Sequence, residues 1–395
     1  MIVVAVASGT SADACDVAVV DVEWQSGSVV MRVVGTSEYP LPDDLPARVL
    51  ATLPPAQLGM EDVSRLDTAL GQAFAEAAAL GIGELAGGAV DLVVSPGQTV
   101  FHDVVDGQCL GTLQLGQPSW IAERTGTPVV SDLRASDVAA GGHGAPLAST
   151  FDALWLADLA SVKPVAALNL GGIANVSVVD PENGLLASFD TGPANCLIDV
   201  AAEQVTSGAL TYDEDGRLAA SGRVDHNVLG RLLDNAYFDI PPPKSTGREL
   251  FSADYLRQAV AGIRLRDADL LATLTEFTAR TVADALRAYD VVEVVASGGG
   301  VRNPVLMRAL GDHLAPCALS RTEDRGVSGD AKEVLMWALL GFLTWHGVSG
   351  TARTRDGVST GAHEPRVLGR ITPGSGPLRM PAPDHSFPYS LRIAP

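Results

Sequence analysis

A repeated order of strands and glycine turns constrains the fold of this chain more than any other feature. Near the N-terminus, three apolar or alternating runs are separated by small-residue turns, at residues 1–6, 17–24 and 28–34. A similar succession begins in the middle of the chain, at residues 165–170, 175–179 and 185–189. Short runs of this kind between Gly or Ser turns predict β-strands. The repeat therefore predicts two similarly built halves.

Helical patterns and buried strands follow each opening meander. The apolar side chains of one stripe recur at steps of three and four, at Leu66, Leu70, Phe74, Ala77 and Leu80. This spacing predicts a helix, and similar patterns predict helices over 269–289 and 335–345. Short apolar runs at 91–94, 128–130 and 291–296 predict buried strands. We therefore expect a duplicated α/β architecture with a cleft between two lobes.

Composition excludes several classes of function. The 395 residues exceed what one hydrophobic core usually serves, which favours two domains. The 27 basic and 47 acidic residues give a formal charge of −20, so nucleic acid and anionic membrane surfaces are poor partners. The four cysteines form no CxxC pair, and the chain has neither a leader-like start nor an apolar run of ~18 residues. We expect a cytoplasmic protein.

Three glycine turns follow predicted strands, at Gly9-Thr10-Ser11, Gly171-Gly172 and Gly298-Gly299-Gly300. Backbone N–H groups in such turns can approach phosphate oxygens or a flat ligand. Asp13 and Asp16 follow the first turn and could reach Mg²⁺ directly or through water. None of the turns is a P-loop or a dinucleotide fingerprint, and each alone could be an ordinary turn. Together, in both halves, they predict a two-lobed phosphate clamp.

Further motifs are distributed in order along nearly the whole chain, at residues 9–16, 97–99, 137–142, 144–147, 169–176, 189–195, 244–249 and 297–303. In this order they are similar to the motifs of the anhydro-N-acetylmuramic acid kinase family. The resemblance implies two lobes of a duplicated ribonuclease H-like, actin-like ATPase fold with a central cleft. It also implies a kinase that uses ATP, Mg²⁺ and water to open a 1,6-anhydro sugar ring and phosphorylate O6, yielding N-acetylmuramic acid 6-phosphate and ADP in cell-wall sugar recycling.

The resemblance also assigns roles to residues. Asp190 matches the catalytic base, which takes a proton from the water that attacks C1 while O6 attacks the γ-phosphate. The ATP-phosphate loop corresponds to Gly9, Thr10, Ser11, Ala12, Asp13, Ala14, Cys15 and Asp16. Gly171 and Gly172 are nucleotide-binding candidates in the second half. The adenosine side corresponds to Gly298, Gly299 and Gly300.

The sugar-binding candidates lie in the first half of the chain. Arg134 and Asp137 are expected to touch the sugar or its lactyl carboxylate, for which a guanidinium is well suited. The alternative is a structural ion pair between these two side chains, one helical turn apart. Gln98 is a further sugar-binding candidate. Residues 244–249 either support the site or form a surface loop, and Glu333 either packs in a helix or contacts ATP.

Domain limits follow from the same resemblance. We expect lobe I to comprise residues 1–133 with about 352–375 and lobe II to comprise 134–351, with 376–395 as a loosely ordered Pro-rich tail. A homodimer is compatible with the family. Pro96 stands where the family usually has histidine, and His143 where it usually has glutamine. These departures leave open a kinase for another anhydro sugar such as levoglucosan. A non-catalytic ATP-binding sensor is the remaining alternative.

Overall fold

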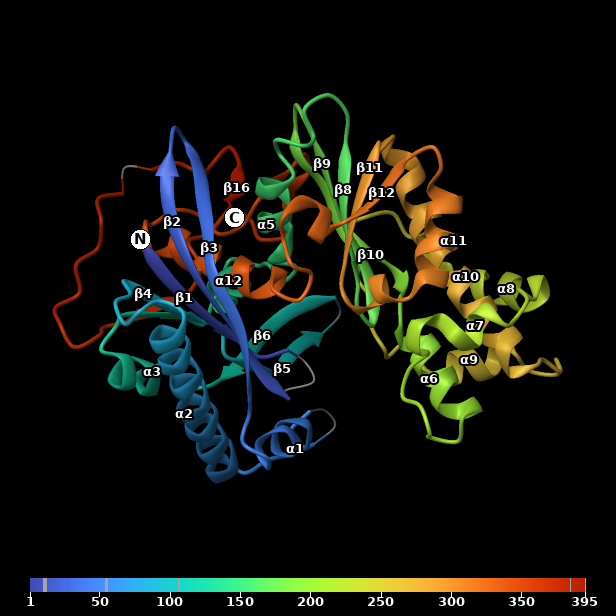
Figure 1. Ribbon diagram of the computed structural model, residues 1–395, viewed down its shortest axis with the longest axis horizontal. Coiled ribbons are helices and arrows are strands. Elements are labelled where there is room, and N and C mark those ends of the chain that lie inside the picture. The colour runs from blue at the N-terminus through green and yellow to red at the C-terminus, as the bar shows by residue number, and fades with distance from the viewer. Residues whose placement is uncertain (10–12, 54–55, 106, 384, 395) are drawn as a thin grey trace. The chain divides into compact units, whose positions relative to one another are not determined.

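The computed structural model describes residues 1–9, 13–53, 56–105, 107–383 and 385–394 (Figure 1). The chain divides into two compact units, Met1–Trp155 with Gly326–Pro395, and Leu156–Arg325. This division differs from the expected limits at 133/134 and 351/352. The physical reason is that the apolar helices α5 (Ala148–Trp155) and α12 (Lys332–Trp345) pack within the first unit, with α12 lying on strands of its sheet.

The first unit is built on a mixed sheet with the strand order β15-β7-β4-β1-β2-β3-β16. Its strands are β1 (Ile2–Ala7), β2 (Ala14–Gln25), β3 (Ser28–Pro40), β4 (Leu92–Ser95), β7 (Val129–Ser131), β15 (Arg370–Thr372) and β16 (Leu391–Ala394). The pairs β1–β2 and β2–β3 are antiparallel, whereas β1–β4 and β4–β7 are parallel. The carboxyl ends of β1, β4 and β7 therefore lie at one edge of the sheet.

The second unit repeats this plan. Its strands are β8 (Val165–Leu170), β9 (Ile173–Asp180), β10 (Gly184–Pro193), β11 (Glu293–Ser297) and β12 (Ala318–Arg321). They are ordered β12-β11-β8-β9-β10, with β8–β9 and β9–β10 antiparallel and β8–β11 and β11–β12 parallel. The five strands β7-β4-β1-β2-β3 of the first unit and β12-β11-β8-β9-β10 of the second have the same order and directions, which confirms the predicted duplicated ribonuclease H-like fold.

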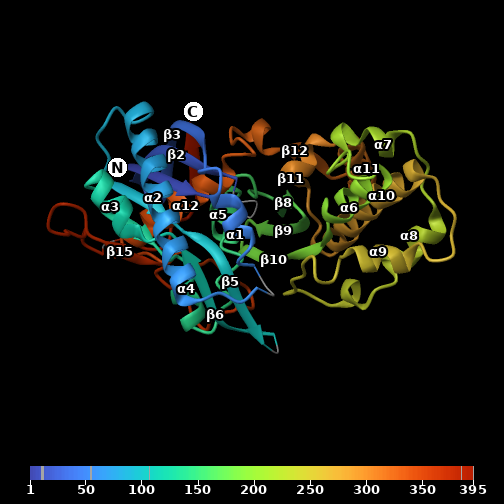
Figure 2. The same cartoon turned by 90° about the horizontal axis from the view of Figure 1, so that it is seen from below.

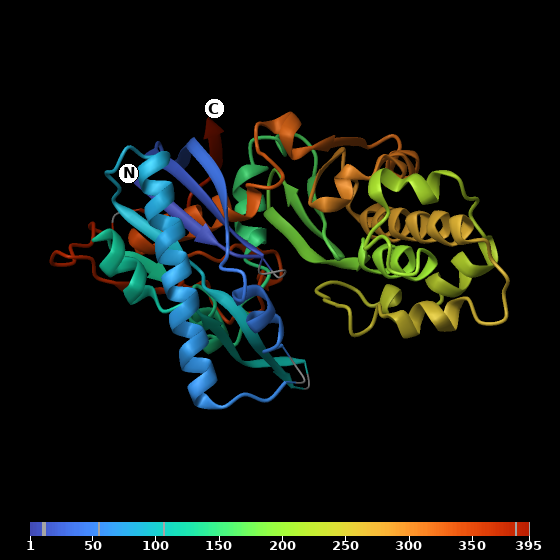
Figure 3. The same cartoon turned by 60° about the horizontal axis from the view of Figure 1, so that its bottom comes forward.

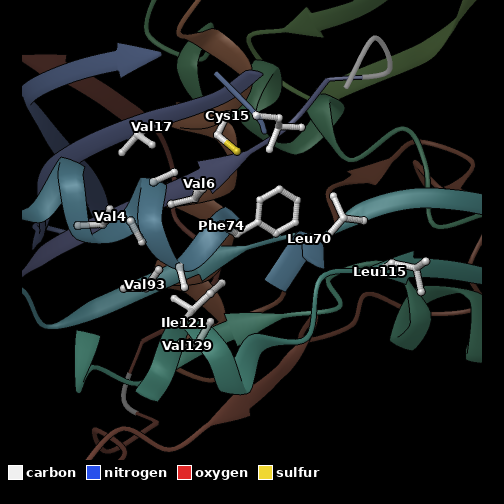
Figure 4. Close-up of a cluster of buried hydrophobic side chains, with 14 of the residues drawn as sticks. Val4, Val6, Cys15, Val17, Leu70, Phe74, Val93, Leu115, Ile121 and Val129 are labelled. Atoms are coloured by element: carbon white, nitrogen blue, oxygen red, sulfur yellow. The ribbon is translucent and has the colours of Figure 1, made fainter. Parts of the chain in front are cut away.

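Helices cover both faces of the first sheet. They are α1 (Leu45–Leu50), α2 (Met60–Glu84), α3 (Pro118–Thr125), α4 (Ala135–Ala139), α5 and α12. Alternate residues of a strand point to opposite faces. Val93 accordingly joins the hydrophobic cluster under α2, whereas its neighbour Val94 contacts Gly341 of α12. Figure 4 shows Leu70 and Phe74 of α2 in this cluster with valines of the sheet, and Figure 3 shows the length of α2 in blue.

Helices of the second unit gather around α10 (Asp267–Leu286), as Figure 2 shows. The others are α6 (Cys196–Val205), α7 (Arg217–Ala220), α8 (His226–Leu233), α9 (Ala253–Ala259) and α11 (Pro304–Leu314). Short 3-10 helices lie at Glu214–Gly216, Ala236–Asp239, Arg287–Tyr289, Gly299–Arg302 and Thr322–Arg325. The predicted helix over 269–289 is confirmed by α10, which is buried along most of its length because its apolar and threonine side chains pack against its neighbours.

Two further hairpins and the C-terminal segment complete the first unit. The hairpins pair β5 (Gln98–Val105) with β6 (Gln108–Leu115), and β13 (Arg353–Thr354) with β14 (Gly357–Val358). The expectation of a loosely ordered tail is wrong at its end, because β16 adds a parallel strand to β3 and His385 stacks on Trp24 with ring centroids 4.3 Å apart. Within the described residues, no helix is both long and apolar enough to cross a membrane.

Candidate active site

The first glycine turn connects β1 to β2 at the edge where the parallel strands of the first unit end. Of the predicted phosphate loop, Thr10, Ser11 and Ala12 lie outside the described residues. Cys15 is 1% exposed, and its side chain belongs to the hydrophobic cluster under α2. Burial, reinforced by Asp16, raises the pKa of the Cys15 thiol to about 12. The thiol therefore stays protonated, and Cys15 can serve a ligand only through its backbone.

Asp16 lies at the start of β2 among other carboxylates. Its pKa is raised to about 6, first by burial and then by the negative charges of Glu38, Glu333, Asp330 and Asp13. A cation or a proton is needed to offset this concentration of charge. Among the described residues, no group of three or more His, Cys, Asp or Glu side chains is arranged to hold a metal alone. A bound cation would therefore need further ligands, such as water or phosphate.

Gln98, the first residue of β5, contacts Gly9 of the predicted phosphate loop. It is 4% exposed, and its Nε2 donates a hydrogen bond of 3.4 Å to the carbonyl oxygen of Gly9. Its Oε1 is buried and has no partner. Because an unsatisfied buried acceptor is costly, this oxygen is suited to receive a hydrogen bond from a ligand hydroxyl. The structure thus brings Gln98 beside Gly9, a proximity that the sequence did not predict.

Arg134 lies at the N-terminal end of α4. Its Nη1 donates to the carbonyl oxygen of Gly144 at 2.8 Å, and its guanidinium stands over the ring of Trp337 at 5.2 Å from the centroid. Burial lowers the pKa of Arg134, and the charge of Glu333 opposes this shift. The guanidinium remains charged because its ordinary pKa is so high. Arg134 is therefore a fixed positive charge with further N–H donors.

Asp137 is fully buried. Its Oδ2 accepts from the backbone N–H of Gly144 at 2.7 Å, and its Oδ1 accepts from Oγ1 of Thr360 at 2.6 Å. A Cβ added at Gly142 would overlap the carboxylate. Among the described ion pairs there is none between Asp137 and Arg134, which was the structural alternative. The contacts of Asp137 position the 141–144 turn, and direct sugar contact stays a prediction for Arg134, Asp137 and Gln98.

The 141–144 turn also carries one departure from the family pattern. His143 donates its backbone N–H to the carbonyl oxygen of Thr360 at 2.9 Å. The pKa of the nearby His102 is lowered by burial, then by the charges of Arg134 and His143. His143 and Arg134 both lower the pKa of His102. Arg134 also donates to the carbonyl oxygen of Gly144, the residue after His143. This places the change of residue type next to a predicted sugar contact.

Asp190 is held near the end of β10 in the second unit. Thr246 donates its backbone N–H to Oδ2 of Asp190 at 2.9 Å, and the Tyr237 hydroxyl donates to the Asp190 carbonyl oxygen at 2.6 Å. Burial raises the pKa of Asp190 to about 6, the Thr246 N–H opposes this, and Glu249 adds to it. A carboxylate with this pKa is largely ionised at neutral pH but basic enough to accept a proton.

Residues 244–249 surround this carboxylate. The backbone N–H of Asp190 donates to the Lys244 carbonyl oxygen at 3.1 Å, while Lys244 Nζ donates to the Tyr237 carbonyl oxygen and lies 4.5 Å from the centre of the Tyr237 ring. Of the two alternatives for this motif, a role in supporting the site fits these contacts. Thr246 was named only as part of the 244–249 motif, and Tyr237 was not predicted, because neither its residue type nor its spacing distinguishes it in the sequence.

The other two glycine turns lie against each other in the second unit. Gly298 has φ +85°, and a Cβ there would lie 2.6 Å from Oδ1 of Asn169. A Cβ at Gly300 would lie 2.7 Å from the Leu170 side chain. Gly299 has no neighbour within 4 Å of such an atom. Packing therefore explains two of these glycines, whereas Gly299 leaves its backbone open to a ligand.

The turn at Gly171 and Gly172 is fixed by the residues that lead into α6. The backbone N–H and Nδ2 of Asn195 donate to the Gly171 carbonyl oxygen at 3.0 and 2.7 Å, and the N–H of Ala194 donates to the Gly172 carbonyl oxygen at 2.9 Å. The carbonyls of this turn are thereby occupied. Its glycine backbone is held rigidly beside the 298–300 turn.

Comparisons with known proteins give one result along the whole chain. Residues 1–374 match the family model described as anhydro-N-acetylmuramic acid kinase. The chain is 51% identical over 394 residues to the anhydro-N-acetylmuramic acid kinase of Streptomyces coelicolor, covering 100% of this chain and 99% of that relative. It is 47% identical over 402 residues to the protein of the same name from Rhodococcus erythropolis, covering 100% and 99%.

Proposed function

This chain belongs to the anhydro-N-acetylmuramic acid kinase family, and on that basis we propose that it opens the 1,6-anhydro ring of anhydro-N-acetylmuramic acid and phosphorylates O6. The oxygen of water bonds to C1 as the C1–O6 bond breaks. O6 bonds to the γ-phosphorus of ATP as ADP leaves, and the proton of water passes to a carboxylate. The products are N-acetylmuramic acid 6-phosphate and ADP.

The observation that supports this proposal best is the setting of Asp190. A general base must be ionised before the reaction and must be able to take a proton during it. Burial raises the pKa of Asp190 to about 6, and the Thr246 N–H fixes Oδ2, so we assign Oδ1 to the attacking water. An aspartate serving only as a turn cap would not need the surrounding 244–249 motif to hold both its backbone and its side chain.

Each unit, taken by itself, carries candidates for ATP binding. They are Gly9 and Asp13–Asp16 in the first unit, and Gly171, Gly172 and Gly298–Gly300 in the second, because glycine turns of this kind can present backbone N–H groups to phosphate or nucleoside. The carboxylates around Asp16 fit a Mg²⁺ ion, because a cation would offset the charge that raises its pKa. Asp16 and Asp13 would hold the ion through water, and Mg²⁺ would neutralise charge on the phosphates.

The sugar is assigned to Arg134 and Gln98. The guanidinium of Arg134 is suited to the lactyl carboxylate, since it is held in place by Gly144 and Trp337. The unpartnered Oε1 of Gln98 is suited to accept from a sugar hydroxyl. Asp137 supports these contacts indirectly by fixing the turn that Arg134 binds.

The direct test is ADP release by the purified protein with Mg·ATP and anhydro-N-acetylmuramic acid, levoglucosan or no sugar. Release that depends on the muramic sugar, with N-acetylmuramic acid 6-phosphate as product, is expected. Release only with levoglucosan would assign the alternative substrate, consistent with the departures at Pro96 and His143. ATP binding without sugar-dependent release would indicate a sensor and refute the proposed reaction.

A further inference from the structure

A pocket of the first unit is lined by none of the residues assigned above to ATP or to the phosphorylated sugar, although Pro96, a departure from the family pattern, lies in its wall. Its volume is about 340 Å³, near the lower end of the ~300–1,000 Å³ range of small-molecule sites. It is bounded by the first half of α2, the end of β6 and the carboxyl ends of β4 and β7. Gln98 and Arg134 do not line it, and the Gln98 amide bonds instead to Gly9.

Three buried polar atoms at this pocket have no hydrogen-bond partner. They are Oγ of Ser95, Oγ of Ser131 and Oε1 of Gln114. The two serines are 2% and 5% exposed and are direct neighbours across the parallel β4–β7 pair. The Gln114 amide nitrogen donates to two threonine hydroxyls, which leaves its oxygen as an acceptor. Buried polar groups nearly always have partners, so three orphans in one place indicate that a partner is supplied from outside the chain.

The remaining lining restricts the chemistry of that partner. Asp132 forms an ion pair of 3.0 Å with Arg370, and Asp67 accepts the backbone N–H of Gly116 at 2.8 Å. Two carboxylates against one cation disfavour an anionic ligand. Val63 and Pro96 add apolar wall. Asp132 also has φ +52°, a strained backbone conformation for a residue other than glycine.

We propose that this pocket binds a neutral monosaccharide at a site separate from the phosphoryl acceptor. Sugar hydroxyls both donate and accept, so they can pair with two serine hydroxyls and one amide oxygen at once. The apolar wall suits the C–H face of a sugar ring. The volume admits a single sugar ring. The acidic lining disfavours nucleotides and acidic sugars, because both are anionic.

Binding can be measured without ATP by saturation-transfer NMR on the full chain, with N-acetylglucosamine as the neutral probe. We expect saturable binding with a Kd on the order of 1 mM. The double variant Ser95→Ala with Ser131→Ala should bind about tenfold more weakly, because two hydrogen bonds are lost. Its thermal stability should equal or exceed that of the wild type, since neither removed hydroxyl has a partner in the protein.

The control variant is Ser177→Ala. Its hydroxyl is equally buried but is bonded to the Ser188 hydroxyl at 3.3 Å, so the variant should lose stability and keep probe binding. Unchanged binding by the double variant would overturn the proposal, as would absence of probe binding, which would leave water as the only occupant. Competition by anhydro-N-acetylmuramic acid would mean that the probe binds at the acceptor site and would overturn the proposal of a separate site. Binding of glucuronic acid as tight as that of N-acetylglucosamine would overturn the assignment of the pocket to neutral sugars.

Discussion

Removal of the charge of Glu249 should shift the acid limb of the pH–rate profile to lower pH. Glu249 is one cause of the raised pKa of Asp190, after burial. The substitution Glu249→Gln keeps the size of the side chain and removes the negative charge. The pKa of Asp190 should then fall, so the ionised, active form of the base persists at lower pH.

The size of this shift follows from the exposure of Glu249. Burial remains the main cause and is unchanged, so the pKa of Asp190 stays above its ordinary value. Glu249 is exposed, and two unit charges about 4 Å apart in fully solvated surroundings interact by ~1 kcal/mol, which corresponds to ~0.7 pKa unit. With a pKa of about 6 for Asp190 in the wild type, the acid limb should shift by up to ~0.7 pH unit.

The assay is kcat/KM for sugar-dependent ADP release between pH 5 and 8 at low ionic strength, since kcat/KM reports the free enzyme. Glu182→Gln removes an exposed charge elsewhere in the second unit and should leave the profile unchanged. Added salt should narrow the difference between Glu249→Gln and the wild type, because exposed charges are screened. An acid limb that moves upward, or one that moves equally in the control, would refute the assignment of Asp190 as the titrating base.

Substitutions at four other positions test the site and its scaffold. Asp190→Asn should lower kcat by ~10²–10⁴-fold, yet by calorimetry above pH 6 it should be at least as stable as the wild type, because a raised carboxyl pKa means that the ionised group opposes folding there. Gly341→Ala should cost ~1–3 kcal/mol in urea unfolding, since the new Cβ overlaps Val94, whereas Gly83→Ala, with open space around it, should stabilise α2 by ~1 kcal/mol. Thr360→Val should cost ~1–3 kcal/mol in the same assay by leaving an oxygen of its buried carboxylate partner without a donor, and Thr360→Ser should restore it.

Local patterns predicted the elements that depend on local contacts. The apolar stripe from Leu66 to Leu80 lies within α2, and the run at 335–345 lies within α12, because a helix repeats its burial every three or four residues. The strand pairs β1–β2 and β2–β3 are joined by short turns, so alternation was sufficient to predict them. By contrast, β16 pairs with β3 from the opposite end of the chain, and its short sequence carries no local signal for that partner.

The site shows the same limit at the level of single residues. Asp137 could be selected from its motif, but the hydroxyl that donates to its Oδ1 belongs to Thr360, which lies 223 residues away. The sequence also treats Gly298, Gly299 and Gly300 alike. Only the three-dimensional neighbours show that two of them are required for packing and that Gly299 alone leaves open space. Residue types in a motif thus indicate candidate ligand-binding residues. Long-range contacts decide which of these candidates are needed for packing and which leave space for a ligand.

Asp16 and Asp190 show why a shifted pKa gains meaning only from its causes. Both carboxyls have a pKa raised to about 6, with burial as the largest cause. Around Asp16 the further causes are four negative charges, which a cation would reverse. Around Asp190 a backbone N–H already opposes the shift, and only one carboxylate adds to it. The first setting suits a group that gains its partner with the nucleotide. The second suits a group that must stay basic throughout the reaction, which is the separation of roles that phosphoryl transfer to a ring-opened sugar requires.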